Sequence, residues 1–374
     1  MYVQDSYARS FTERSQFMSF LDEIEDRADW MVCPTDSLYV TAAEMNPAVC
    51  RQIQQAEDGE TLLDDTRQNT GLFIKADGKD YPLGTTAMKT LQNRARIYGN
   101  ALQDLDRPTF AGVLNDCLQV TSGQALLRLQ EGKIRAVHGG DPKDYAVLPM
   151  PELFEAANLY LEESYGKVAF STGYFSHNLV IASWQLQEPE LLDTYRDLLL
   201  QYGEQAPEEL SACIRVQSSD VASSGANICC LLQEGSDQRP LILGSEIKLE
   251  HTNGATVEKF SGNLTQIFAR YQESIKKLER LFQQEIQYPD FAMEAMMKKV
   301  GIGKQLTMRT VEHFRATHGT GKANGYELYC GICEAVFFAQ CKGATPENLI
   351  DLEEMVARCL SLRFEDYDFP GESW

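Results

Sequence analysis

The stretch ALLRLQEGKIRAVHGG, residues 125–140, decides how the centre of this 374-residue chain folds. Two runs of alternating apolar and polar residues flank Glu131-Gly132, and a polar residue followed by Gly favours a tight two-residue turn. The stretch therefore predicts a β-hairpin.

The same pattern recurs along the chain. GLFIKADGKDYPL (71–83) predicts a hairpin about Asp77-Gly78, and KVAFSTGYFSHNLVIASWQL (167–186) predicts one that turns near His177-Asn178. Further strands are expected in 210–220, 226–235 and 240–254, and helices in 85–99, 108–119, 151–166 and 189–203. Hairpins that alternate with helices predict an α+β fold with an antiparallel sheet rather than a parallel βαβ sheet.

The C-terminal part of the chain has helical periodicity. Residues 263–286 carry a continuous apolar stripe, and Asn263 with Gln266 resembles a capping box at its start. Further helices are predicted over 290–300, 305–317, 326–341 and 346–362.

The first 70 residues are predicted to form an acidic N-terminal extension. A helix (14–28) and an extended piece (29–42) precede a polar, acidic segment (54–71) that has the composition of a linker. The predicted organisation is an extension over 1–70, an α+β core domain over 71–262 and a helical region over 263–374.

The charge is strongly acidic and uneven. The net charge is −21, with 14 acidic and 4 basic residues in 1–65, but residues 259–322 hold 11 basic and 6 acidic ones. No long apolar run and no basic leader with an apolar core is present, and the ten cysteines lack the spacing of a disulfide scaffold. We expect a cytoplasmic protein with reduced thiols and no membrane partner.

Two apparent motifs fail on inspection. Gly321-Lys322 is followed by Ala323 and preceded by a predicted helix, whereas a phosphate-binding P-loop needs Ser or Thr after the Lys and a strand before the loop. Cys330 and Cys333 have helical spacing and no second cysteine pair, so they are interpreted as core thiols. No nucleophile motif occurs, and we predict no catalytic residues, no metal and no cofactor.

Basic side chains suggest one candidate site. Arg128 and Arg135 lie on the arms of the 125–140 hairpin, with Lys143 and Tyr145 just beyond it, and this combination suits a phosphate backbone with a stacked base. Lys276, Lys277 and Arg280 lie outside the apolar stripe of the long helix and complete the candidate nucleic-acid-binding set. A solvated hairpin face without a ligand is the alternative.

The hairpin region also resembles a known family. ALLRLQEGKIRAVHGGDPKDYAVLP (125–149), followed in order by LEHTNG, EKFSGN and YELYCGICEA, is similar to the phage/plasmid-like proteins of unknown function, a domain-of-unknown-function group found on mobile genetic elements. The resemblance covers roughly residues 70–342. It implies a mobile-element context and supplies no reaction.

Three functions remain open on these grounds. The first is a non-enzymatic, nucleic-acid-associated protein of a mobile element that acts in recombination or replication, with single-stranded DNA as its partner. The second is a protein-interaction or anti-defence factor whose acidic surface imitates DNA and binds a host or mobile-element protein. The third is an enzyme whose dispersed site residues carry no motif.

Overall fold

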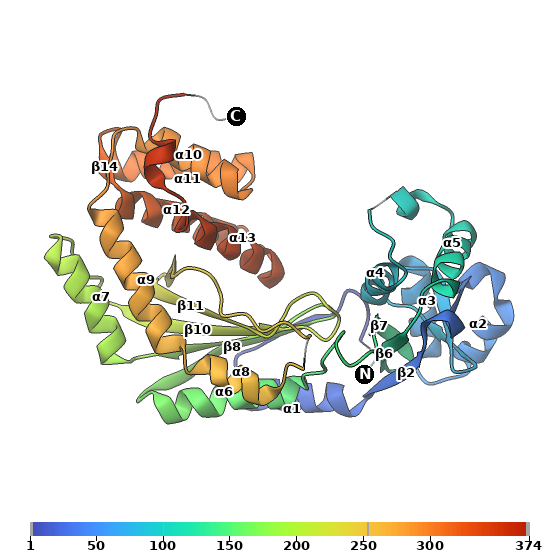
Figure 1. The fold of residues 1–374 in the computed structure, drawn as a ribbon. Coiled ribbons are helices and arrows are strands. Elements are labelled where there is room, and N and C mark those ends of the chain that lie inside the picture. The colour runs from blue at the N-terminus through green and yellow to red at the C-terminus, as the bar shows by residue number, and fades with distance from the viewer. Residues whose placement is uncertain (1–2, 100, 253, 372–374) are drawn as a thin grey trace.

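The computed structural model describes residues 3–99, 101–252 and 254–371, which form two lobes (Figure 1). The small lobe holds residues 28–140, and the large lobe holds residues 3–27 and 141–371. The two main apolar cores follow this division. The predicted α+β class is confirmed, since antiparallel sheets are combined with many helices. The parts of our predicted segments at 1–2, 253 and 372–374 lie outside the described residues.

A six-stranded antiparallel sheet forms the centre of the large lobe. Its strands, in spatial order, are β1 (Ala8–Phe11), β8 (Val168–Ser176), β9 (Val180–Leu186), β10 (Leu210–Ser218), β11 (Asn227–Glu234) and β12 (Arg239–Ile242). The predicted hairpin at 167–186 is confirmed, because β8 pairs with β9 on either side of His177.

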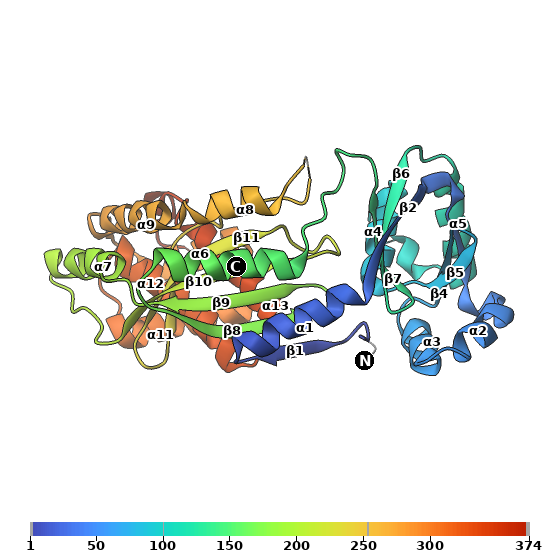
Figure 2. The same ribbon diagram turned by 90° about the horizontal axis from the view of Figure 1, so that it is seen from below.

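Helices cover both faces of this sheet. Figures 1 and 2 place α1 (Arg14–Asp26), α6 (Met150–Ser164) and α8 (Val257–Leu264) on one face, and α12 (Gly325–Cys341) and α13 (Pro346–Cys359) on the other. Because both faces are covered, every residue of β10 is buried, polar ones included. The remaining large-lobe elements are α7 (Pro189–Gln201), α9 (Ile267–Phe282), β13 (Glu285–Ile286), α10 (Pro289–Val300), α11 (Lys304–His318) and β14 (Ala323–Asn324).

The small lobe contains two three-stranded antiparallel sheets. One is β2 (Ala28–Pro34), β6 (Gln124–Gln130) and β7 (Lys133–Gly139), and the other is β3 (Tyr39–Ala42), β4 (Leu72–Ala76) and β5 (Lys79–Pro82). Their helices are α2 (Pro47–Gln54), α3 (Gly59–Gln68), α4 (Thr85–Arg94) and α5 (Arg107–Gln119).

The two predicted small-lobe hairpins are confirmed. Glu131-Gly132 and Asp77-Gly78 each have two consecutive positive φ angles, 48° and 77° in the first pair and 45° and 76° in the second. Two consecutive left-handed residues are what a type I′ hairpin turn requires, and Gly adopts this conformation without strain.

The predicted N-terminal extension is not a separate unit. Strand β1 pairs with β8 at the edge of the large sheet, β2 pairs with β6, and β3 pairs with β4. The segment interpreted as an acidic linker contains α3. The boundaries at 70 and 262 therefore do not match the lobes, because the chain leaves the large lobe after α1 and returns to it before α6.

The C-terminal helical region is present, with one correction. The predicted long helix at 263–286 is two helices, α8 and α9, separated at Thr265 and Gln266. Thr256 caps α8 by accepting from the backbone N–H of Lys259, so the proposed cap at Asn263 is wrong. Gly321-Lys322 lies in the loop between α11 and β14, as predicted.

Candidate functional site: a cleft between the lobes

A cleft of about 750 Å³ lies where the two lobes meet. The small lobe contributes Thr85, Thr86 and Lys89 from α4. The large lobe contributes the end of β10, the loop that leads to β11, residues from 246 to 252, and the first turns of α13. Small-molecule sites have volumes of about 300–1,000 Å³, so this cleft is large enough for one.

Two buried amides form part of the large-lobe wall. Asn227 donates from Nδ2 to Glu246 Oε2 at 2.9 Å, and this contact fixes the orientation of its amide. Its Oδ1 has no donor within the described residues, and neither has Oε1 of Gln217. These two side chains are only 6% and 4% exposed. Buried oxygens without donors are costly, and both of these lie in side chains that line the cleft.

Glu246 adds a carboxylate beside these amides. Burial raises the pKa of Glu246, and the positive charge of Arg215 partly offsets that rise. Arg215 is itself buried and forms an ion pair with the buried Glu353 of α13. Since Arg215 is already paired, a cation placed near Glu246 would restore the charge balance of this wall.

The rim of the cleft is acidic. Tyr174 donates to Glu347 at 2.9 Å, and Lys248 pairs with Glu354 at 3.2 Å. The pKa of Glu347 lies below its usual value, because hydrogen bonds to Ser176 and Tyr174 outweigh the opposing effect of burial. Two lysines face five carboxylates in the lining, which are Glu246, Glu250, Glu347, Asp351 and Glu354. A concave surface lined by charges of one sign concentrates the electrostatic potential and attracts ligands of opposite charge.

Tyr145 and His251 form part of another wall of the cleft, and they belong to a stack of aromatic rings that continues behind it. Tyr145 lies 3.8 Å from His138 and 5.3 Å from His251 between ring centroids, and Trp30 lies 5.8 Å from Tyr145. Burial lowers the pKa of His138 to about 4 and also lowers that of His251. Both histidines are therefore neutral at pH 7, and they do not offset the acidic rim.

Ser218 and His251 resemble a nucleophile and its base, but they are not accessible to a substrate. Ser218 Oγ lies 3.0 Å from His251 Nε2, and His251 Nδ1 lies 3.2 Å from the carbonyl oxygen of Ala146. With Nδ1 as the donor to that carbonyl, Nε2 accepts from the Ser218 hydroxyl. Ser218 is fully buried and does not line the cleft, so this pair positions the His251 ring.

Arg128 joins the two lobes. It projects from β6 of the small lobe and donates to Glu25 of α1 at 2.7 Å and to Asp220, after β10, at 2.9 Å. Its guanidinium carbon lies 5.0 Å from the centroid of the Trp30 ring. The two carboxylates raise the pKa of Arg128 despite the opposing effect of burial. These contacts fix the angle between the lobes and with it the shape of the cleft.

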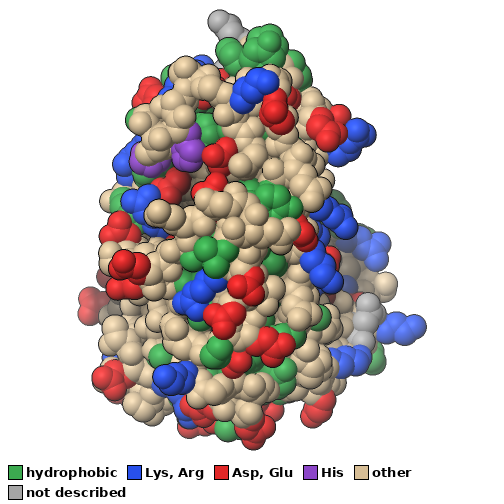
Figure 3. Space-filling model, turned by 90° about the vertical axis from the view of Figure 1, so that its left-hand side faces the viewer, with side chains coloured by type: hydrophobic (Ala, Val, Ile, Leu, Met, Phe, Trp, Pro, Cys, Tyr) green, Lys and Arg blue, Asp and Glu red, His purple; other side chains and the backbone are tan. Residues whose placement is uncertain are grey.

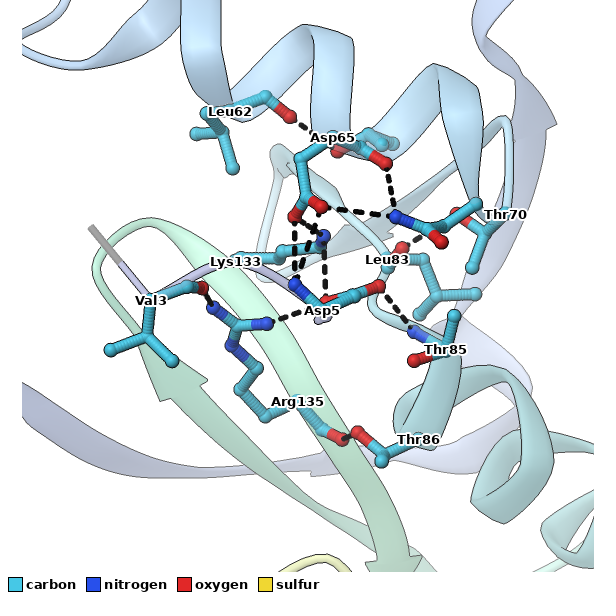
Figure 4. Close-up of polar contacts among 12 residues, drawn as sticks. Val3, Asp5, Leu62, Asp65, Thr70, Leu83, Thr85, Thr86, Lys133 and Arg135 are labelled. Carbon is cyan, nitrogen blue, oxygen red and sulfur yellow. Dashed lines mark hydrogen bonds and ion pairs between the residues drawn. The ribbon is translucent and has the colours of Figure 1, made fainter. Parts of the chain in front are cut away.

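A second buried ion network ties the N-terminal segment to the small lobe (Figure 4). Lys133 Nζ lies 2.9 Å from Asp5 and 2.7 Å from Asp65, and Arg135 lies 2.6 Å from Asp5 and donates to the carbonyl oxygen of Val3. Asp5 also accepts from the backbone N–H of Thr85, at the start of α4. The residues before β1 therefore pack between the lobes.

The structure corrects the predicted hairpin site. The Arg128 and Arg135 side chains are 1% and 3% exposed, so they are not available to a phosphate backbone. Their carboxylate partners, Glu25, Asp220 and Asp5, come from distant segments of the chain. Lys143 is exposed, and Tyr145 lines the cleft inside the aromatic stack.

The predicted helix residues lie elsewhere. Lys276 and Arg280 are exposed on α9, and Lys277 is half-buried and pairs with Glu273 at 3.0 Å. Helix α9 lies at the end of the large lobe opposite the β6–β7 hairpin (Figure 1). Seen from that end, several Lys and Arg side chains gather along one edge, while acidic and basic side chains are mixed elsewhere (Figure 3). The two halves of the predicted site do not converge on one groove.

The cleft residues were missed, although the sequence contains one relevant signal. Arg215 and Gln217 occupy alternate positions of the predicted strand 210–220, and this spacing places two polar side chains on one face. Asn227 begins the next strand. Polar side chains on one face of strands that are otherwise apolar indicate either a cavity that this face lines or a buried ion pair. Both are present here.

The Cys330 and Cys333 thiols lie on α12. Cys333 is buried, and burial raises its pKa to about 12. No group of three or more His, Cys, Asp or Glu side chains is arranged as a metal site within the described ranges.

The sequence and the structure were also compared with known proteins. No protein-family model matches the chain, and no curated protein or solved structure is detectably similar to it. Among the helices that the structure describes, none is long and apolar enough to span a bilayer.

Proposed function

We propose that this chain is a binding protein whose interlobe cleft receives a small organic cation rich in N–H donors, an amine or a guanidine. The observation that carries the proposal is the pair of buried oxygens, Gln217 Oε1 and Asn227 Oδ1, which have no donor within the described residues. Glu246 next to them and the carboxylates of α13 supply the complementary charge. Charge-assisted hydrogen bonds of this kind are the stronger ones in proteins.

Calorimetric titration with putrescine, spermidine, agmatine and arginine tests the proposal. We expect saturable binding of at least one of them, and a loss of affinity of about tenfold or more in Glu246→Gln, because a hydrogen bond to a charged group is lost. Affinity should also fall as the pH drops through the raised pKa of Glu246. Glu312→Gln, which removes an exposed carboxylate on α11, is the matched control and should bind as the parent does.

Two results would refute the proposal. One is that none of the four cations binds, and the other is that Glu246→Gln and Glu312→Gln weaken binding equally. The second result would mean that the overall negative charge, rather than this cleft, attracts the cations.

Nucleic-acid association is the second candidate function, and one observation favours it. Lys276 and Arg280 are exposed side by side with Lys277 on α9, as an interface to a phosphate backbone requires. This proposal retains the mobile-element setting, the phage/plasmid-like resemblance, a role in recombination or replication, and single-stranded DNA as partner. The buried Arg128 and Arg135 are no longer part of it.

Charge reversal at Lys276, Lys277 and Arg280 tests this second candidate. Single-strand binding should be lost, and each lost phosphate contact should lower the slope of its salt dependence by about 0.7. Thermal stability should stay nearly unchanged, because exposed substitutions shift it by only about 0.5 kcal/mol. If the parent protein binds no DNA or RNA at low salt but captures basic proteins, the acidic protein-interaction or DNA-mimic function replaces it.

A further inference from the structure

A second cavity, of about 580 Å³, lies in the small lobe. It is bounded by a short 3-10 turn (Ala43–Met45), helices α2 and α3, and the first residue of α5. Arg51, Arg67 and Arg107 line it, and Glu44 is the one acid in its lining. A chain with 34 basic and 55 acidic residues thus gathers three arginines around one small pocket.

The three guanidinium groups keep most of their donors available. Arg51 has no hydrogen-bond or ion-pair partner in the part of the chain that the structure describes. Arg67 lies 3.6 Å from Asp64, and both side chains are at least half exposed, so this pair is weak. Arg107 donates to the carbonyl oxygen of Asn69 at 3.4 Å, which is long for such a bond. Each guanidinium has five N–H donors in a planar fork.

Gly71 positions one of the three arginines. Its φ is +66°, a conformation that favours glycine, and the Arg107 side chain lies against it. A Cβ at this position would lie 3.5 Å from Arg107 Cγ. The carbonyl oxygen of Gly71 accepts from the backbone N–H of Ala43 at 2.8 Å, and this bond fixes the floor of the pocket. The Arg107 side chain therefore lies along the Gly71 backbone at one side of the pocket.

The floor of the pocket is apolar. Ala43 and Cys50 belong to a small core cluster that includes Phe73, and Pro47 lies beside them in the lining. Cys50 donates from Sγ to the carbonyl oxygen of Ala43 at 3.5 Å, so its thiol is directed to the backbone. An apolar floor below three cations suits a ligand with an anionic group and an apolar or planar body.

We infer that this small-lobe pocket binds an oxyanion, a phosphate monoester or a carboxylate, carried by a small molecule with a planar or apolar body. The site is independent of the interlobe cleft, because the two linings share no residue and have opposite charge. Arginine forks bind both kinds of oxyanion through paired N–H···O bonds, which explains why three of them surround one cavity.

Calorimetric titration of the full chain with inorganic phosphate, a mononucleotide and benzoate tests this inference. We expect one site per chain for the mononucleotide or benzoate, with inorganic phosphate weaker because it lacks the apolar body. Arg51→Gln and Arg67→Gln should each lower the affinity about tenfold or more. Both positions are exposed, so the variants should stay folded. Arg363→Gln, at an arginine that is 75% exposed near the C-terminus, is the matched control.

Several results would overturn the inference. It is wrong if none of the three anions binds at about 1 mM, or if Arg363→Gln weakens binding as much as Arg51→Gln does. It is also wrong in its ligand class if a 5′-phosphorylated oligonucleotide binds through Arg51 while the mononucleotide does not. Each outcome is separate from a failure of the cleft, which the Glu246→Gln titration with cations reports.

Discussion

Gln217 and Asn227 lie directly opposite each other in the β10–β11 pair, and each leaves its side-chain oxygen without a donor within the described residues. Opposed residues of an antiparallel pair place their side chains on the same face, so the two oxygens belong to one surface. Both residues line the cleft, and we interpret them as contacts for a ligand. This interpretation has consequences for stability.

Replacing Gln217 by Met should leave the free energy of unfolding unchanged or slightly higher. Met has a similar shape and removes a buried acceptor that has no donor. Asn115→Leu is the contrasting control, because Asn115 bonds both backbone groups of Val40 at 2.7 and 2.8 Å. That variant should lose about 2 kcal/mol or more. Urea denaturation measures both, and a loss above about 1.5 kcal/mol in Gln217→Met would show that the amide is structural.

Replacing Arg128 by Met should destabilise the protein by about 3 kcal/mol, because Glu25 and Asp220 of the large lobe would lose the cation that the small lobe supplies to both of them. This figure is at the lower end for a broken ion pair, since both carboxylates are partly exposed. Arg27→Met loses an exposed pair with Glu23 and a longer, 3.4 Å pair with the partly buried Glu131, and it should cost less than about 1 kcal/mol. Equal losses in the two variants would argue against a special role for Arg128.

Deleting residues 1–65 should abolish cooperative unfolding. The deletion removes β1, β2 and β3 from their sheets and takes Phe17, Phe20 and Leu21 out of the large core. Deleting residues 370–374 is the control, because Asp368 is the last residue in the described part of the chain whose side chain accepts from the backbone of another segment, at Gln287 and Tyr288. Calorimetry distinguishes the two, and a sharp transition in the shorter chain would restore the view that the N-terminal segment is an extension.

Acid should destabilise the protein through His138. Its folded pKa, about 4, is below the ordinary value of 6.5, so the unfolded state takes up the proton first. The stabilising contribution is complete above pH 6.5 and is lost as the pH falls towards 4, by up to about 3 kcal/mol. His138→Phe keeps the ring stack with Tyr145 and should have a shallower decline. Identical slopes between pH 7 and 4.5 would rule out His138 as the source.

The sequence predicts the local turns well and the long-range pairings poorly. Asp77-Gly78 and Glu131-Gly132 identify two hairpins, because a left-handed turn is a property of neighbouring residues. The pairing of β1 with β8 places Ala8 opposite Ser176, and no local pattern in either segment indicates a partner so far away in the sequence. The break between α8 and α9 also lacks a local signal, since neither Gly nor Pro occurs at Thr265 and Gln266.

The predicted nucleic-acid site shows that long-range ion pairs, too, cannot be recognised from the sequence. Neither arm of the 125–140 hairpin contains an acid that could pair with Arg128 and Arg135, and only the folded chain shows that Glu25, Asp220 and Asp5 surround them. The linker interpretation of residues 54–71 failed for a related reason. Asp65 is one of the five acids in that segment, and it is buried against Lys133.

Because the small lobe is inserted into the sequence of the large lobe, the elements of the two lobes become available for folding in a fixed order during translation. Every strand of the small lobe has been translated once β7 is complete, and this lobe has its own core. By contrast β1 must wait for β8, and α1 must wait for α6, both made later. Val3 and Asp5 find their small-lobe partners once β7 is complete, but β1 and α1 stay without theirs while that lobe folds downstream of them. Domains generally fold as units during translation, so β1 and α1, which are made first and wait for elements made after the small lobe, are the segments that a chaperone would protect.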